Sequence, residues 1–368
     1  AAAKLVDQLD SADPALGDGL SFATTIAAEI DALGAPVDLA ESEDADASSA
    51  AIFTAGPAAL RALAMHPEIA LEVRLWAAEA AAAIGALSPA ELALAYLRPA
   101  FADDELVDPL RVAGDAPDAL GRALLFQASR QQLAPDMRAA VLAALFAPSP
   151  DDGPDRGPGF GPVARATGVS LLTVAPDERV IWFAADALPA LIANQRYETA
   201  QAWYLALAEH AVNDPEARGA QLAVLPLLAA ARVGIGRTWD PAMAVLWWRG
   251  LPASYDEAAR AVVATPVFMV LDALGLRMGP EAWALYRSAP ETIVATVPNV
   301  GIRFAMRDAA RARRVGEAAL WALVALGPGG PAAADPIALG SVIRSLRAIG
   351  LGDDAQALAL ESLIERGR

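Results

Sequence analysis

The clearest hydrophobic pattern in the chain lies within residues 193–211, which read ANQRYETAQAWYLALAEHA. A second apolar stretch, residues 182–195, leads into it and shares its first three residues. A link of only a few residues predicts that the two stretches form antiparallel helices in a hairpin, with a small alanine at their closest approach. Four residues of the second helix share one face, because they are spaced by three, four and three: Tyr197, Ala200, Tyr204 and Leu207.

A small residue in the first turn of a second helix recurs along the chain. From Ala200 onward the intervals between such alanines are 42, 40, 36 and 37 residues. Several of these helices begin with Asp or Ser next to Pro or Glu, which are typical helix start signals. A period of this size built from helix–turn–helix units predicts an α-solenoid. The alanines in question are Ala90, Ala200, Ala242, Ala282, Ala318 and Ala355.

Residues 182–207 resemble a unit of the tetratricopeptide-repeat superfamily, because their helical face matches that family's tyrosine, alanine, aromatic and small positions. The last copy is similar through Gly350 and Ala355. The chain departs from the family at Leu188, where a glycine is expected, and at Leu207, where an alanine is expected. The resemblance implies a right-handed superhelix of helix hairpins that binds a protein or peptide in a concave groove without catalysis. The carboxyl-terminal part also resembles uncharacterised alanine-rich helical proteins of GC-rich bacteria.

Strand-forming residues nowhere alternate with polar ones over a useful length, so the sequence predicts an all-α protein without a significant β-sheet. Two stretches interrupt the helices. One is acidic and lacks the large apolar groups needed to offset the entropy of ordering, and the other is rich in proline and glycine. They predict an N-terminal helical segment at 1–33, an acidic linker or loop at 34–50, helical repeats at 51–146, a Pro/Gly-rich loop at 147–162 and helical repeats at 163–368.

The formal net charge of −17 argues against a nucleic-acid partner and against docking on an anionic membrane. No uncharged apolar run approaches the roughly 18 residues of a membrane-spanning helix. Cysteine is absent, which suits an exported protein. The small residues that follow Ala1 fit a processed mature end and a cut end equally. We therefore expect a periplasmic or otherwise exported protein, with a cytoplasmic one as the alternative, and leave the oligomeric state open.

Few residues suggest catalytic chemistry. His66 and His210 lie far apart and gather no set of metal ligands, so we expect neither a metal nor another cofactor. The sequence GPGFG at 157–161 lacks the Gly-Lys-Ser/Thr ending of a phosphate loop. One acidic run could be the magnesium-binding motif of an isoprenoid synthase, but we interpret it as the start of a helix. That run contains Asp103, Asp104, Glu105 and Asp108.

Two features are candidates for partner binding. Adjacent Trp247 and Trp248 point about 100° apart on a helix, so both are buried only if that helix is enclosed on two sides. Otherwise one of them is expected in an exposed groove, where tryptophan often dominates binding. Four arginines, spaced by four, four and three, predict a cationic stripe along one helix. The stripe forms ion pairs with neighbouring repeats, or it binds an acidic peptide or anion. Its members are Arg303, Arg307, Arg311 and Arg314.

These patterns favour a non-catalytic scaffold or adaptor of the bacterial cell envelope, which binds a protein or peptide partner in the groove of a solenoid. The arginine stripe would suit an acidic partner. The alternative is an all-α enzyme, or an enzyme accessory domain, that acts on glycans or isoprenoids.

Overall fold

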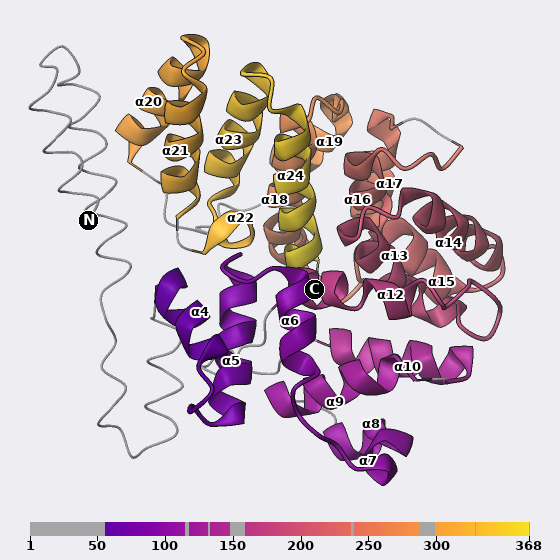
Figure 1. Cartoon of the computed structure of the whole chain (residues 1–368). Coiled ribbons are helices and arrows are strands. Elements are labelled where there is room, and N and C mark those ends of the chain that lie inside the picture. Colours follow the sequence, from indigo (N-terminus) through magenta and orange to yellow (C-terminus); the bar gives the residue numbers. More distant parts are fainter. Residues whose placement is uncertain are drawn as a thin grey trace, which may run out of the picture.

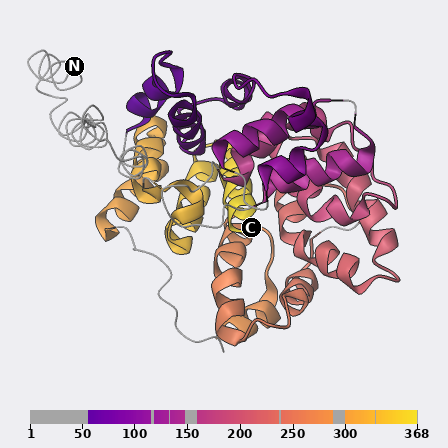
Figure 2. The same ribbon diagram turned by 90° about the horizontal axis from the view of Figure 1, so that it is seen from below.

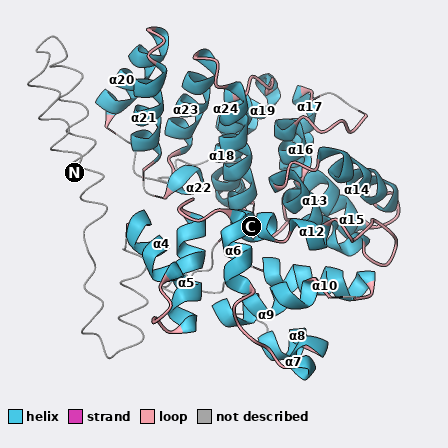
Figure 3. Ribbon diagram, viewed as in Figure 1, coloured by secondary structure: helices cyan, strands magenta, loops and turns pink. Residues whose placement is uncertain are grey.

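The structure, a computed structural model, describes residues 56–114, 118–131, 133–147, 159–236, 239–287, 299–327 and 329–367. Every regular element within these ranges is a helix and none is a strand (Figure 3). The all-α prediction is therefore confirmed. None of the described helices is long and apolar enough to cross a membrane. The segment 1–33 and the acidic stretch 34–50 lie outside the described residues.

The helices fall into two groups, on either side of the Pro/Gly-rich stretch. The first group is α4 (Pro57–Met65), α5 (Leu71–Ala83), α6 (Pro89–Tyr96), α7 (Asp103–Val107), α8 (Pro109–Ala113), α9 (Ala119–Ser129) and α10 (Pro135–Phe146). The second begins with α11 (Phe160–Ala166), α12 (Gly168–Leu171), the 3-10 helix η2 (Ile181–Phe183), α13 (Ala184–Ala193), α14 (Tyr197–His210), α15 (Pro215–Ala223), α16 (Leu225–Ala231) and α17 (Pro241–Gly250). It continues with α18 (Glu257–Ala273), α19 (Gly279–Arg287), α20 (Val300–Arg311), α21 (Val315–Leu326), α22 (Gly330–Ala333), α23 (Pro336–Ala348) and α24 (Gly352–Arg366).

Many helices begin at a capping side chain, as the start signals predict. Ser88 and Glu91 form a capping box at α6. At α17 the carboxylate of Asp240 accepts hydrogen bonds from two backbone N–H groups, and a proline follows it. These side chains satisfy N–H groups that have no partner within the helix. Aspartates cap other helices in the same way: Asp118, Asp214, Asp256 and Asp335.

The predicted hairpin at 182–211 is present. Helices α13 and α14 pack together, and Gln195, with a φ of 56°, lies in the link between them. The face of α14 that meets α13 includes three of the four predicted residues, together with Trp203, which is fully buried. Tyr197, the fourth, is 36% exposed because it is the first residue of the helix.

The recurring alanines fall into a buried group and an exposed group. Ala200, Ala282, Ala318 and Ala355 are buried, as expected for close helix contacts. The prediction is wrong for Ala90 and Ala242, both of which are exposed. Each follows the proline that opens its helix, so it lies in the first turn on the solvent side. In α17 the fully buried small residue is Ala244, two positions later.

Helix α24 lies in the middle of the molecule (Figure 2). In that view the chain runs in an arc from α4 past α10, α14 and α18 to α21, and α24 occupies the space inside the arc. Helix α24 packs against α11, α13, α16 and α18 as well as its neighbour α23. In a linear repeat array each unit contacts only its neighbours. These contacts bring the end of the described chain onto its middle.

The core consists of one large cluster and one small one. The large cluster runs through most of the described helices. The small cluster contains only Ala309, Ala310 and Ala318, with Trp321 and Ile349 at its edge. It joins α20 and α21 to α23, and these helices stand side by side with α24 in Figure 1. Because alanines provide little side-chain volume, they allow α20 to lie close to its neighbours at this point.

Candidate functional site

The main candidate site is a groove between α20 and α23, with a volume of about 650 Å3. We call it the arginine groove. Its lining contains five arginines and no acidic residue among the residues that the structure describes, although the whole chain carries a net charge of −17. The lining residues are Val300, Arg303, Phe304, Met306, Arg307, Ala310, Arg311, Arg313, Ser341, Arg344, Ser345 and Ala348.

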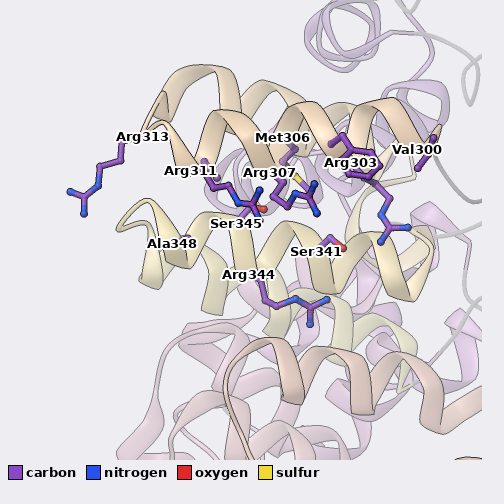
Figure 4. Close-up of a pocket in the computed structure, with 12 residues that line it drawn as sticks. Val300, Arg303, Met306, Arg307, Arg311, Arg313, Ser341, Arg344, Ser345 and Ala348 are labelled. Atoms are coloured by element: carbon purple, nitrogen blue, oxygen red, sulfur yellow. The ribbon is translucent and has the colours of Figure 1, made fainter.

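Three arginines of the predicted stripe lie together in this groove. Arg303, Arg307 and Arg311 extend from α20 toward α23 (Figure 4). Arg344 of α23 also lines the groove, and the sequence pattern did not identify it because it belongs to another helix. Arg313 lies at the end of α20 and extends outward in Figure 4. The groove therefore combines charges from two helices that are separate in the sequence.

The fourth predicted residue, Arg314, does not belong to the stripe. Helix α20 ends at Arg311, and Arg313 adopts a left-handed φ of 56°, so the chain turns before Arg314. Arg314 is the N-cap residue of α21 and forms an ion pair with Glu317. This hydrogen-bonded pair lowers the pKa of Glu317 and raises that of Arg314. The prediction of a single four-arginine stripe is wrong because a regular helical period does not continue through the turn.

The groove arginines have weak or missing ion pairs among the described residues. Asp308 lies 4.0 Å from Arg307 and 3.9 Å from Arg311, at the limit of a salt bridge. The Nε atom of Arg303 is buried and has no hydrogen-bond partner in the described structure. The guanidinium of Arg307 stacks over the Phe304 ring, 4.4 Å from its centroid. Among the described acids, only Asp272 lies closer to a groove arginine, at 3.3 Å from Arg344. Most of this positive charge is therefore not neutralised by nearby described side chains.

Arginines elsewhere in the molecule serve a different purpose. Arg138 donates to the carbonyl oxygens of Ser129 and Gln131 at the end of α9. Arg260 donates to the carbonyl oxygen of Trp248 in the last turn of α17 and to those of Pro252 and Tyr255 in the loop that follows. Arg218 binds two carbonyls at the end of α14 in the same way. These side chains satisfy carbonyl groups that helix ends leave unpaired. The side chains of the groove arginines on α20 make no comparable hydrogen bond among the described residues.

Trp247 and Trp248 do not form a partner-binding surface. They are only 4% and 6% exposed, and both rings pack against Phe268 of α18. The expectation that one of them is exposed is wrong because α17 is enclosed on two sides, so that both directions from the helix lead into the core.

The other sequence candidates occupy structural positions. Glu105 is in the first turn of α7, where its carboxylate accepts a hydrogen bond from the Ala102 N–H at 2.7 Å. The acidic run from Asp103 is thus a helix start, as interpreted. His66 ends α4, and His210 ends α14, 3.4 Å from Asp214. Among the described residues, no group of histidines and carboxylates could hold a metal ion.

The glycine-rich sequence at 157–161 contributes an anion site that the protein fills itself. Glu365 of α24 accepts hydrogen bonds from the N–H groups of Phe160 and Gly161, at 3.1 and 2.6 Å. Gly159, with a φ of 79°, precedes them, and a Cβ atom there would lie 2.9 Å from the carboxylate. The described part of this sequence therefore binds a carboxylate of its own chain, which explains why it has glycines but not the lysine of a phosphate loop.

A buried ionic cluster escaped the sequence analysis. Glu79 of α5 pairs with Arg122 of α9 through two hydrogen bonds of 2.8 and 2.6 Å, and Tyr96 donates to the same carboxylate at 2.8 Å. All three residues are buried. Burial and the neighbouring Glu79 charge raise the pKa of Tyr96, and Glu79 outweighs the cost of burial to raise the pKa of Arg122. No sequence pattern indicates pairs that are 43 residues apart.

Comparisons with known proteins identify no family for this chain. No family model, curated protein or solved structure matches it. Its function is therefore argued from the arginine groove and the surrounding fold.

Proposed function

We propose that the protein is a non-catalytic interaction protein that binds an acidic segment of a partner protein in the arginine groove. The observation that carries this proposal is the convergence of Arg303, Arg307 and Arg311 on a groove whose described lining has no carboxylate. Arginine binds carboxylates through two parallel hydrogen bonds. A complementary acidic partner would neutralise charge that the described residues leave uncompensated.

The surrounding helices act in this proposal as a scaffold of stacked hairpins, similar to a tetratricopeptide-type right-handed superhelix. The hairpins α13–α14, α20–α21 and α23–α24 support this part. The contacts of α24 with α11 and α13 require a scaffold that curves back on itself. We place the protein in the bacterial cell envelope, because a chain without cysteine suits an exported protein. Cell fractionation tests that location.

The test of binding is capture of the partner in the cell that makes the protein. The variant Arg307→Glu with Arg311→Glu reverses two charges of the groove. We expect it to keep its helical circular dichroism and to lose about tenfold or more of the cross-linked partner, a loss of roughly 1.4 kcal/mol in binding. The matched control reverses Arg196 and Arg277, which are exposed and outside the groove.

The control variant should capture the partner as the original protein does. Equal capture by the groove variant would show that the arginines serve only the protein's own ion pairs. Equal loss in both variants would show that net charge matters and the groove does not.

A further inference from the structure

The shape and spacing of the arginine groove restrict the conformation of its ligand, and this inference rests on the proposed function. Its rim is cationic, but its floor is apolar: Met306 is 1% exposed and Ala310 is 5% exposed. A polyanion with charge on every side would leave this floor without an apolar contact. A peptide can provide carboxylates and small apolar side chains in alternation.

The size of the groove favours an extended ligand over a helical one. Arg303 and Arg311 are about 12 Å apart along the axis of α20. A helix with its side chains is about 10–12 Å across, and over that length it would fill about 900–1,400 Å3. The groove provides about 650 Å3. An extended chain is thinner, and about five of its residues span about 13 Å.

The spacing of the charges also fits an extended chain. Successive groove arginines are four residues apart, which is about 6 Å along the helix. Alternate side chains of an extended peptide point the same way and are about 6.6 Å apart. Three carboxylates at every second position would therefore each face one arginine: Arg303, Arg307 and Arg311 (Figure 4).

The opposite wall of the groove faces the side chains that lie between the carboxylates. On α23 this wall presents Arg344 and three small residues, Ser341, Ser345 and Ala348. The Ser341 hydroxyl donates to the carbonyl of Ile337 at 2.8 Å, so it is oriented within its own helix. Side chains of an extended peptide alternate between its two faces, so those that point toward α23 meet these small residues and the Arg344 guanidinium.

We propose that the arginine groove binds an extended acidic peptide segment with a carboxylate at every second position. The probes are three fluorescein-labelled peptides, each built from three glutamates and six alanines. One alternates Glu and Ala in its centre, one places glutamates four residues apart as a helical stripe, and one has them in a block. Fluorescence anisotropy of the full chain at low ionic strength measures each affinity.

We expect the alternating peptide to bind at least about tenfold more tightly than its two isomers, and Arg307→Glu with Arg311→Glu to abolish this preference. Equal affinity for all three peptides, lost in the variant, would overturn the extended alternating ligand but leave the proposed function standing. Binding that the variant does not weaken, or none at all, would overturn both. A thymidine oligonucleotide that outcompetes every peptide at the groove would overturn the choice of a peptide ligand.

Discussion

Arg122, near the start of the described chain, and Arg307, near its end, place the same guanidinium group in opposite surroundings. Arg122 is buried and meets Glu79 through two hydrogen bonds. Arg307 is exposed, stacks on Phe304 and has its nearest described carboxylate, that of Asp308, at 4.0 Å. Removing a charge from water is costly unless a partner compensates it, so Arg122 must be paired for the fold to form. Arg307 has no such requirement and remains available for a ligand.

The difference shows that charge count alone does not locate a binding site in this molecule. Most of the arginines described above donate to helix ends or to one fixed carboxylate, and these residues contribute to stability. The groove arginines on α20 differ because the closest described acid, Asp308, lies at the limit of a salt bridge from Arg307 and Arg311. A site for an anion is therefore indicated by arginines whose hydrogen bonds the fold leaves unmade.

The largest change in stability is expected at the buried ion pair of Arg122 and Glu79. Replacing Glu79 with alanine removes the carboxylate that compensates the Arg122 charge and accepts the Tyr96 hydrogen bond. We expect the free energy of unfolding to fall by about 3–5 kcal/mol, the usual cost of breaking a buried ion pair from one side. Urea unfolding followed by circular dichroism measures this change.

The control replaces both Glu79 and Arg122 with methionine, which removes both charges and keeps most of the volume. We expect a smaller loss than in the single variant, because no uncompensated charge stays buried. If the single variant stays within about 1 kcal/mol of the original protein, burial does not make this pair essential and the comparison fails.

An effect of intermediate size is expected at the surface ion pair of Arg61 and Glu91. The hydrogen bond from Arg61, followed by those from Ser88, lowers the pKa of Glu91 to about 2. Because the folded pKa lies below the ordinary value of about 4.3, the pair's contribution to stability is complete above that value. It is lost as the pH falls through about 2.

Carbon NMR titration of the Glu91 carboxyl group should give this low midpoint. The variant Arg61→Gln should move the midpoint upward, though not fully, because the Ser88 hydrogen bonds remain. An unchanged midpoint in the variant would mean that Ser88 alone sets the pKa, and that an exposed arginine has no measurable influence on its carboxylate.

The smallest effect on stability is expected in the groove. Replacing Arg307 and Arg311 with alanine removes a repulsion of a few tenths of a kcal/mol and a cation–π contact of similar size with Phe304. We expect the free energy of unfolding to stay within about 0.5 kcal/mol of the original, as measured by the same urea titration. A loss above about 2 kcal/mol would mean that these arginines hold the fold together, as Arg122 does.

The sequence predicted what depends on local spacing. The α13–α14 hairpin and the shared face of Arg303, Arg307 and Arg311 follow from helical periodicity, which neighbouring residues determine. The error at Arg314 came from a turn, which the spacing of the arginines does not indicate. The error at Ala242 came from the position of a proline within one helical turn.

What the sequence could not predict depends on contacts between distant segments. Whether Trp247 and Trp248 are exposed is decided by the enclosure of α17 between other helices. Arg344 joins the groove only because α23 packs beside α20. The bonds between Glu365 and the α11 backbone link residues 204 and 205 positions apart. Pairings of this kind have no local signature in a single sequence.

The central position of α24 has a consequence for biosynthesis. Helices α11, α13, α16 and α18 all emerge from the ribosome before α24, which covers part of their surface. Until residues 352–366 have been translated, those helices lack a packing partner, and exposed apolar surface of this kind makes nascent chains prone to aggregation. The core that the structure describes is therefore complete only after α24, Gly352–Arg366, has been translated, and a chain cut short before Gly352 would have an unfinished core.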